Sequence, residues 1–221
     1  MPILIVNQHH PDARAGLAQR FFAWTHIRGG SPEYARAVAE HKRALFADLR
    51  GPVLEIGPGD GANFEYLPAG VRWVGLEPNV FFHDHLRALL ADSGIDGEVR
   101  AGVAERLDFA DSSFDAVIST LVLCSVTDQA TVLSEIRRVL RPGGRFIFIE
   151  HVAAPAGSSL RRTQRWIKPI WRVVADGCHP DRDTAAAIAR AGFAQVEITP
   201  FRAPIPVASP QIAGTAHKAE D

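Results

Sequence analysis

A glycine-rich segment, Gly57-Pro58-Gly59-Asp60-Gly61, constrains the fold of this chain more than any other feature. It follows the apolar run 53–57 and precedes a helical pattern that we expect to extend through Leu67. Glycines let a backbone turn sharply and let a ligand approach closely, because no Cβ atom is in the way. The first N–H groups of a following helix also lack partners within that helix. The segment therefore predicts a strand, a ligand-binding turn and a helix in succession.

The rest of the chain continues this alternation of short apolar runs and helical patterns. We expect strands at 71–77, 98–103, 114–120, 145–151 and 194–199, and helices at 79–91, 128–140 and 181–191. We expect residues 211–218 to add a last edge strand or an antiparallel strand, after a proline-rich stretch, 200–210, that predicts a stiff connector rather than a hairpin turn. The alternation is typical of α/β folds with βα units around a parallel sheet.

Two regions lie outside this alternation. Residues 1–50 are expected to form an N-terminal helical extension, with helices at 14–24 and 32–49. Residues 51–221 are expected to form the main domain, in which residues 155–180 are a lid-like insertion after the fifth strand. A chain of this length suits one large α/β domain, so we expect one structural unit.

Charge and composition exclude several classes of protein. The chain has 24 basic and 25 acidic residues, so we expect no nucleic acid partner. Its most apolar stretch, 116–126, is far shorter than the about 20 residues of a membrane-spanning helix, and the N-terminal MPILIV run lacks the flanks of a signal peptide. Two cysteines do not make a disulfide framework, and no C-x-x-C or H-E-x-x-H spacing occurs. We therefore expect a cytoplasmic protein with no metal site.

Glu77 adds a second element to the glycine loop. It ends the next expected strand, and its carboxylate can accept hydrogen bonds from both ribose hydroxyls of an adenosine ligand. Gly57, Gly59 and Ala62 also satisfy the dinucleotide pattern G-x-G-x-x-G/A, so the loop alone leaves a nicotinamide-dependent dehydrogenase open. Glu55 favours a different ligand, because a carboxylate there can bind an ammonium group, which a pyrophosphate does not offer.

Segments farther along the chain complete a family pattern. Ala104-Glu105, residues 109–115 and residues 140–144 lie at expected strand ends, and with the glycine loop they resemble class I S-adenosylmethionine-dependent methyltransferases. The resemblance implies a Rossmann-like, seven-stranded, mostly parallel sheet, with S-adenosylmethionine as cofactor and S-adenosylhomocysteine as product. Val103 departs from the pattern, since many members carry Asp there. The resemblance implies these cofactor-binding residues: Glu55, Gly57, Gly59, Gly61, Asn63, Glu77, Pro78, Ala104, Glu105, Thr120 and Leu121.

A closer resemblance is to the thiol methyltransferases of the methyltransferase-like seven group. The matching stretches are Gly61-Ala62-Asn63-Phe64, Glu77-Pro78-Asn79, 120–126 (TLVLCSV), 150–154 (EHVAA) and Asp176-Gly177-Cys178, within a similarity from Tyr34 to Ala216. The resemblance implies methyl transfer to the thiol of a small acceptor. Animal members carry an apolar membrane-anchoring segment at the N-terminus, where this chain has only MPILIV. We therefore expect no integral membrane anchor.

His151 and Asp176 are the candidate catalytic residues. His151 ends the fifth expected strand, at the edge where open α/β sheets bind ligands, and suits a base or a group that orients the acceptor. A strand-end histidine bonded to the backbone is the alternative. Asp176 and His179 lie in the inserted segment and can enter the same mouth, with loop capping as the alternative. Cys124 has apolar neighbours, which favours a small packed side chain over a nucleophile.

The inserted segment bears on the acceptor. The spacing of Trp166, Ile170 and Val173 predicts an amphipathic lid packed over the cavity, and the interleaved basic residues leave contact with nucleic acid or acidic lipid as the alternative. We therefore expect an S-adenosylmethionine-dependent methyltransferase of a small lipophilic acceptor, with a thiol implied by the resemblance alone. The alternatives are N-, O- or C-methylation of a metabolite or lipid headgroup, and a cofactor-binding module without turnover.

Overall fold

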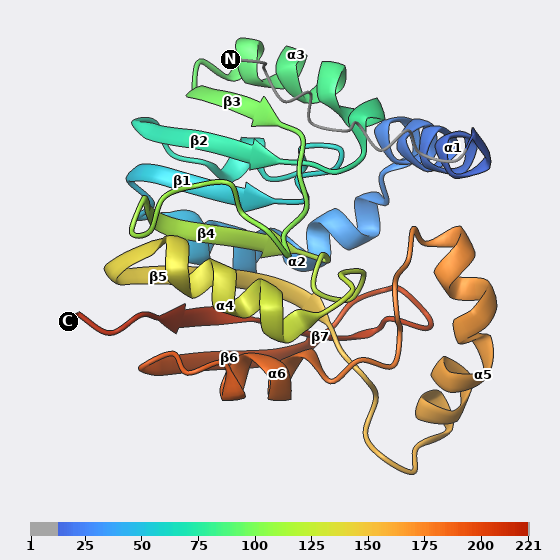
Figure 1. Ribbon diagram of the computed structural model, residues 1–221. Coiled ribbons are helices and arrows are strands. Elements are labelled where there is room, and N and C mark those ends of the chain that lie inside the picture. The colour runs from blue at the N-terminus through green and yellow to red at the C-terminus, as the bar shows by residue number, and fades with distance from the viewer. Residues whose placement is uncertain (1–12, 221) are drawn as a thin grey trace, which may run out of the picture.

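The computed structural model describes residues 13–220, which form a seven-stranded sheet flanked by helices (Figure 1). The strands are β1 (Gly51–Ile56), β2 (Val71–Leu76), β3 (Asp96–Arg100), β4 (Phe114–Thr120), β5 (Leu140–His151), β6 (Gln195–Arg202) and β7 (Pro210–His217). Their order is β3-β2-β1-β4-β5-β7-β6, with β1 to β5 parallel and β7 antiparallel to both of its neighbours. The predicted α/β fold with a mostly parallel sheet is confirmed. The N-terminal MPILIV run lies outside the described residues.

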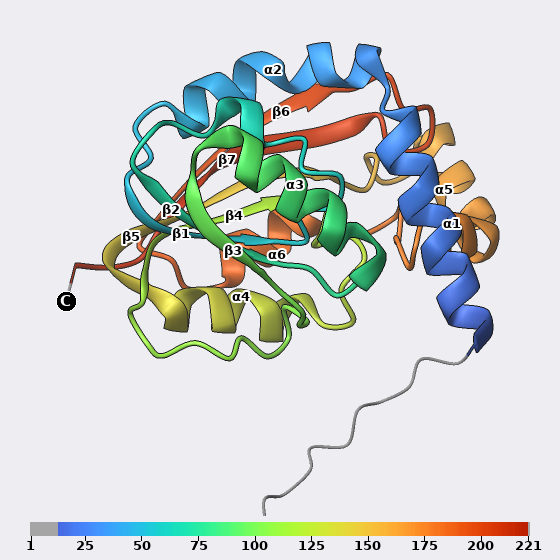
Figure 2. The ribbon, with the colours of Figure 1, turned by 90° about the horizontal axis from the view of Figure 1, so that it is seen from above.

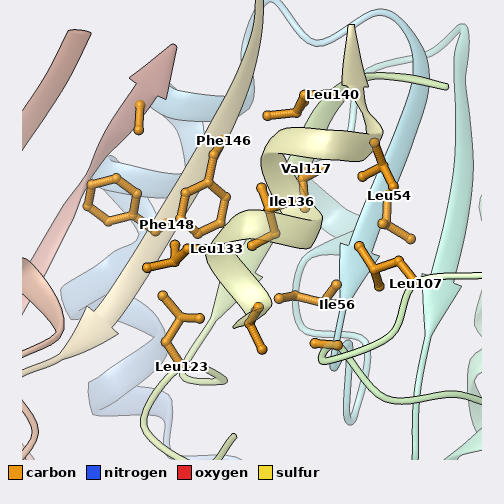
Figure 3. Packing of buried hydrophobic residues seen from close by; sticks show 14 of the residues in the cluster. Leu54, Ile56, Leu107, Val117, Leu123, Leu133, Ile136, Leu140, Phe146 and Phe148 are labelled. Carbon is orange, nitrogen blue, oxygen red and sulfur yellow. The ribbon is translucent and has the colours of Figure 1, made fainter. Parts of the chain in front are cut away.

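Helices cover both faces of the sheet. Figure 2 shows α2 (Pro32–Phe46) and α3 (His83–Ser93) on one face, with α4 (Gln129–Val139) and α6 (Thr184–Arg190) on the other. Successive side chains of a strand point to opposite faces, so neighbouring residues of β1 enter different cores. Val53 packs in the cluster that contains Phe46 of α2, whereas Leu54 packs in the cluster that contains Ile136 of α4 (Figure 3).

The sequence pattern predicts a helix after β1, and this prediction is wrong. Residues 57–63 form turns, and only a short 3-10 helix, η1 (Phe64–Tyr66), follows them. Leu67 is extended, as expected for a residue that precedes proline, and this ends the helical turn. The N-terminal end of a longer helix is therefore absent from the ligand side of the loop.

The proline-rich connector is also shorter than the sequence predicts. β6 and β7 pair as an antiparallel hairpin, with Arg202 opposite Pro210, so only residues 203–209 form the connection. The expectation that residues 200–210 are not a hairpin turn is wrong. Pro200 lies within β6, and proline is tolerated there because β6 is an edge strand.

Two helices lie beyond the carboxyl ends of the parallel strands, at the right of Figure 1: α1 (Ala13–Gly29) and α5 (Ser159–Val174). The sequence predicts that the apolar stripe of α5 packs over the cavity, and this is wrong. Trp166 is 81% exposed and Val173 is 77% exposed, so this side of the helix faces away from the protein. Gln164 on the opposite side is buried and bonds backbone groups of two loops. None of the helices within residues 13–220 combines the length and the apolar character needed to cross a membrane.

Candidate functional site

A cavity of about 660 Å³ opens at the carboxyl ends of the parallel strands. Its walls come from the segments that follow β1 to β5, from α1, from the end of α5 and from the 203–209 connection. Cavities of this size hold small molecules and cofactors, and the ends of parallel strands are where open α/β sheets bind them. The expected site residues can therefore be placed relative to this cavity.

The glycine loop borders the cavity through its first two glycines. Gly57 and Gly59 have backbone φ angles of +57° and +55°, which residues with a side chain rarely adopt. A Cβ on Gly57 would lie 2.7 Å from the Val122 side chain, whereas a Cβ on Gly59 would meet no protein atom within 4 Å. Gly61 differs, because a Cβ there would lie 2.6 Å from Leu89 of α3 and Gly61 does not line the cavity. The third glycine thus lets the loop pack on a helix.

Glu77 follows β2, and its carboxylate holds the glycine loop through a hydrogen bond. One carboxylate oxygen accepts a hydrogen bond from the Gly59 N–H at 3.0 Å, and the other accepts from the Asn79 N–H at 2.8 Å. Burial raises the pKa of Glu77 to about 7 against the effect of these two N–H donors. Glu77 and Pro78 both line the cavity. The carboxylate therefore lies on the cavity wall beside the glycine loop.

Glu55 and Asn63, which are buried, and Thr120, which is half-buried, form a brace behind the loop and do not line the cavity. The Glu55 carboxylate accepts hydrogen bonds from Asn63 Nδ2 and Trp73 Nε1, both at 2.8 Å. Asn63 Nδ2 also donates to Thr120 Oγ1 at 3.1 Å, which ties the loop to the end of β4. Burial raises the pKa of Glu55. This geometry gives Glu55 a role in holding the loop rather than a free carboxylate in the cavity.

The segments after β3 and β4 line the far side of the cavity with Ala104, Glu105 and Leu121. Glu105 accepts a hydrogen bond from the Thr127 N–H, which joins these two segments. Leu121 has a φ angle of +58° and donates its N–H to the Ile149 carbonyl at 2.9 Å. A left-handed residue with a Cβ is strained, and such strain is typical of sites where the surroundings fix a functional turn.

The remaining end of the cavity holds His151 with both cysteines. His151 Nε2 lies 2.9 Å from Cys178 Sγ, to which Trp171 Nε1 donates a hydrogen bond at 3.2 Å. Cys124 lies in the same cluster, and all three residues line the cavity. Hydrogen bonding with Cys124, opposed by burial and assisted by His151, lowers the pKa of Cys178 to about 5. His151 is therefore not a strand-end histidine bonded to the backbone.

The inserted segment brings Asp176 but not His179 to the cavity wall. Asp176 has a φ angle of +42°, and burial raises its pKa, opposed by the charge of His26 on α1. His179 donates its backbone N–H to the Cys124 carbonyl at 2.9 Å, which fixes the chain beside the cysteines. The two candidates in this segment are thus separated by the turn at Gly177.

Several cavity residues have no signal in the sequence pattern. Gln19, Phe22 and His26 of α1 line one wall, and Ile205 and Ala208 of the 203–209 connection line another. The helical spacing of the α1 residues was visible, but nothing in it shows which face turns toward the cavity. The two cysteines lie far apart in the sequence, and only the fold brings them together with His151.

Comparison with known proteins gives consistent results. Residues 54–148 match the family model described as "Methyltransferase domain". The chain is 37% identical over 198 residues to thiol S-methyltransferase TMT1A of Homo sapiens, covering 84% of this chain and 81% of the relative. It is 42% identical over 192 residues to thiol S-methyltransferase TMT1B of Mus musculus, covering 80% and 78%. The [4+2]-cyclase SpnF has a similar fold, with a TM-score of 0.72 at 14% identity over 92% of this chain and 94% of that one.

Proposed function

Because the chain belongs to the family of S-adenosylmethionine-dependent methyltransferases that includes thiol S-methyltransferases TMT1A and TMT1B, we propose that it methylates the thiol of a small lipophilic acceptor. One observation carries the acceptor class. The similarity to proteins named thiol S-methyltransferase extends over 84% of this chain and so beyond the cofactor-binding half, residues 54–148, that the family model matches.

The cavity fits the cofactor of this family. Gly59 leaves space where a Cβ would otherwise point, and the backbone of Gly57 borders the same space. The Glu77 carboxylate stands beside them and can accept hydrogen bonds from ribose hydroxyls. When bound, S-adenosylmethionine supplies a methyl group on a positively charged sulfonium.

We assign the cofactor-binding residues to two groups by their place in the structure. Those that line the cavity are proposed to touch the cofactor: Gly57, Gly59, Glu77, Pro78, Ala104, Glu105 and Leu121. Those behind the loop are proposed to hold it in shape: Glu55, Gly61, Asn63 and Thr120. In this assignment Glu77 binds the ribose, and the segment from Ala104 to Glu105 faces the adenine.

Methyl transfer to a thiol requires an in-line arrangement of three atoms. The acceptor loses its S–H proton, its sulfur forms a bond to the methyl carbon, and the bond between methyl and sulfonium breaks with its electron pair going to the leaving sulfur. Holding these atoms in line contributes several kcal/mol to catalysis. We propose that His151 promotes loss of the acceptor proton and that Asp176 orients the acceptor, because both line the cavity.

The acceptor end of the cavity supports a lipophilic substrate. Its walls include Trp171, which bonds Cys178, and we propose that Trp171 and Ile205 offer apolar surface to an acceptor chain. Burying a methylene group contributes about 0.8 kcal/mol, which corresponds to about a fourfold change in affinity.

A series of straight-chain thiols tests this proposal. KM should fall about fourfold for each added methylene until the alkyl chain fills the cavity. Each methylene group is transferred from water to an apolar surface of the protein. The matched alcohols should be competitive inhibitors with the same length dependence and should not be methylated. A KM that does not change with chain length would show that the acceptor does not bind along this wall.

A further inference from the structure

Three metal-binding side chains meet at the acceptor end of the cavity. Cys124 follows β4, His151 ends β5 and Cys178 follows α5, and their ligand atoms all lie within 4.8 Å of one another. They are 2%, 3% and 7% exposed, so the cluster is buried, yet each of the three lines the cavity. No fourth Cys, His, Asp or Glu joins this cluster within residues 13–220.

The donor set fits zinc. Two thiolates and an imidazole are ligands that Zn²⁺ prefers, and they neutralise its charge. Zn–S bonds of about 2.3 Å and Zn–N bonds of about 2.0 Å place the ligand atoms of a tetrahedral site about 3.5 to 3.8 Å apart. The three ligand atoms lie within 4.8 Å of one another, and the 2.9 Å contact between His151 Nε2 and Cys178 Sγ has to widen by a fraction of an ångström to reach this spacing.

Nearby groups support a bound cation. Trp171 Nε1 donates to Cys178 Sγ at 3.2 Å, as outer groups do to metal-bound thiolates. Glu150 is fully buried, and within residues 13–220 its Oε2 has no hydrogen-bond partner. A bound cation would give this buried carboxyl group an electrostatic partner.

Within the described part of the chain, the ring of His151 has one polar contact, with Cys178. Its Nδ1 atom is buried and finds no hydrogen-bond partner in the described part of the chain, so the contact with Cys178 alone orients Nε2. A histidine that serves only to finish a strand would bond to the backbone. The ring instead places Nε2 2.9 Å from Cys178 Sγ, within a cluster that also holds the Cys124 thiol.

We propose that Cys124, His151 and Cys178 bind a Zn²⁺ ion whose fourth position faces the acceptor cavity. Three protein ligands with one open position are typical of catalytic zinc sites, whereas structural sites are closed by four. The sequence gives no such indication, because the ligands come from three separate segments. In this site His151 promotes proton loss from the acceptor as a metal ligand and not as a base.

The open position gives the ion a role, and this step rests on the proposed function. An acceptor thiol that takes the fourth position releases its proton to solvent, because a thiol coordinated to zinc is deprotonated. The ion would thus supply a thiolate at the acceptor end of the cavity, held through Cys124, His151 and Cys178. The methyl-transfer step keeps the balance of bonds given above, with zinc unchanged.

Metal analysis of the reduced, full-length protein tests the site without any turnover. Protein purified without chelators should contain about one zinc per chain, and replacement by Co²⁺ should give thiolate-to-cobalt charge-transfer absorption in the near ultraviolet with the intense visible bands of a tetrahedral site. Trp171→Phe should weaken metal binding about tenfold, since it removes an outer hydrogen bond. His179→Ala, a neighbour outside the cluster, should keep full metal content.

Cys124→Ser and Cys178→Ser should each lose the charge-transfer band while keeping the affinity of the folded protein for S-adenosylmethionine. That retained affinity separates loss of the metal from loss of the fold. Unchanged protein that binds S-adenosylmethionine but takes up neither zinc nor cobalt would overturn the proposal, and the cluster would then be a hydrogen-bonded pair of thiols with an imidazole.

The cobalt spectrum also tests metal binding and coordination of the acceptor thiol as two separate questions. Adding hexanethiol to the cobalt protein should shift and intensify the charge-transfer band, whereas hexanol should leave it unchanged. If the cobalt spectrum does not change when the thiol is added, the metal site is supported. The proposal that the acceptor thiol is its fourth ligand is then overturned. Methylation of thiols by protein that takes up no metal would support the proposed function and overturn the zinc site.

Discussion

Glu77 is a buried carboxyl group whose ionisation affects both stability and binding. Its pKa is about 4.5 in an unfolded chain and about 7 in the folded protein, because burial outweighs its two N–H donors. Below pH 4.5 the group is protonated in both states. As the pH rises toward 7, the unfolded chain releases this proton first, so unfolding becomes easier, and above pH 7 the loss of stability is complete.

A pH series of urea denaturation tests this assignment. The free energy of unfolding should fall by about 3 kcal/mol more in the unchanged protein than in Glu77→Gln between pH 4.5 and pH 8, as an order of magnitude. Glu98→Gln, on an exposed part of β3, is the control and should follow the unchanged protein. The same pH dependence in Glu77→Gln would show that this carboxyl group does not have a raised pKa.

At the scale of single residues, motif spacing located the cofactor side of the site better than the acceptor side. Gly57, Gly59 and Glu77 line the cavity as their positions after strands predict. Glu55 could not be placed in the same way, because its partners Asn63 and Trp73 depend on how the loop folds back over the sheet. The meeting of Cys124 with Cys178 likewise depends on the path of a whole inserted segment.

Helix α1 forms one wall of the cavity and packs on the segment after β2 and on α3. Ala23 is 1% exposed and packs against Phe82 and Leu86, next to Phe22 on the cavity wall. Ala23→Glu should displace α1 and weaken binding of S-adenosylmethionine about tenfold, or about 1.4 kcal/mol, because one wall is lost. Calorimetry measures the affinity, and limited proteolysis reports the displacement.

The control for this prediction lies on the same helix. Leu17 is 67% exposed, so Leu17→Glu should leave both α1 and the affinity unchanged. A displaced α1 in Ala23→Glu together with full affinity for the cofactor would exclude the helix as a wall of the cofactor site.

Helix α5 gives a matched pair of exposed and buried side chains. Trp166 is 81% exposed, so Trp166→Ala should change the free energy of unfolding by less than about 0.5 kcal/mol. Gln164 is fully buried and bonds the Ala154 N–H and the Val207 carbonyl, so Gln164→Ala should cost about 1 to 3 kcal/mol. Chemical denaturation measures both. A large cost for Trp166→Ala would mean that the apolar stripe is packed in solution.

At the scale of elements, periodicity predicts that a helix forms but not which side it buries. The stripe at Trp166, Ile170 and Val173 is real, yet α5 docks through the polar side chain of Gln164 because two loops present backbone groups there. In the loop after β1, by contrast, the predicted helix does not form. Its residues have helical spacing, but positive φ angles at Gly59 and Gly61 with an extended Leu67 prevent a regular helix.

For the whole molecule, the order of apolar runs along the chain predicted the α/β class and its mostly parallel sheet. The pairing of the last strands depends on contacts that no local pattern records. β7 enters between β5 and β6, because the 203–209 connection reverses the chain. This reversal also brings Ile205 and Ala208 to the cavity, so the same long-range step completes the sheet and the acceptor wall.

We propose that this fold transfers a methyl group to sulfur. The most direct test supplies S-adenosylmethionine with a deuterated methyl group and lipophilic thiols, amines and phenols of matched size, and then detects S-adenosylhomocysteine and the labelled product by mass spectrometry. We predict equal amounts of S-adenosylhomocysteine and labelled thioether, with no labelled amine or phenol ether. Label found only on nitrogen or oxygen, or cofactor binding with no release of S-adenosylhomocysteine from any acceptor, would contradict the claim.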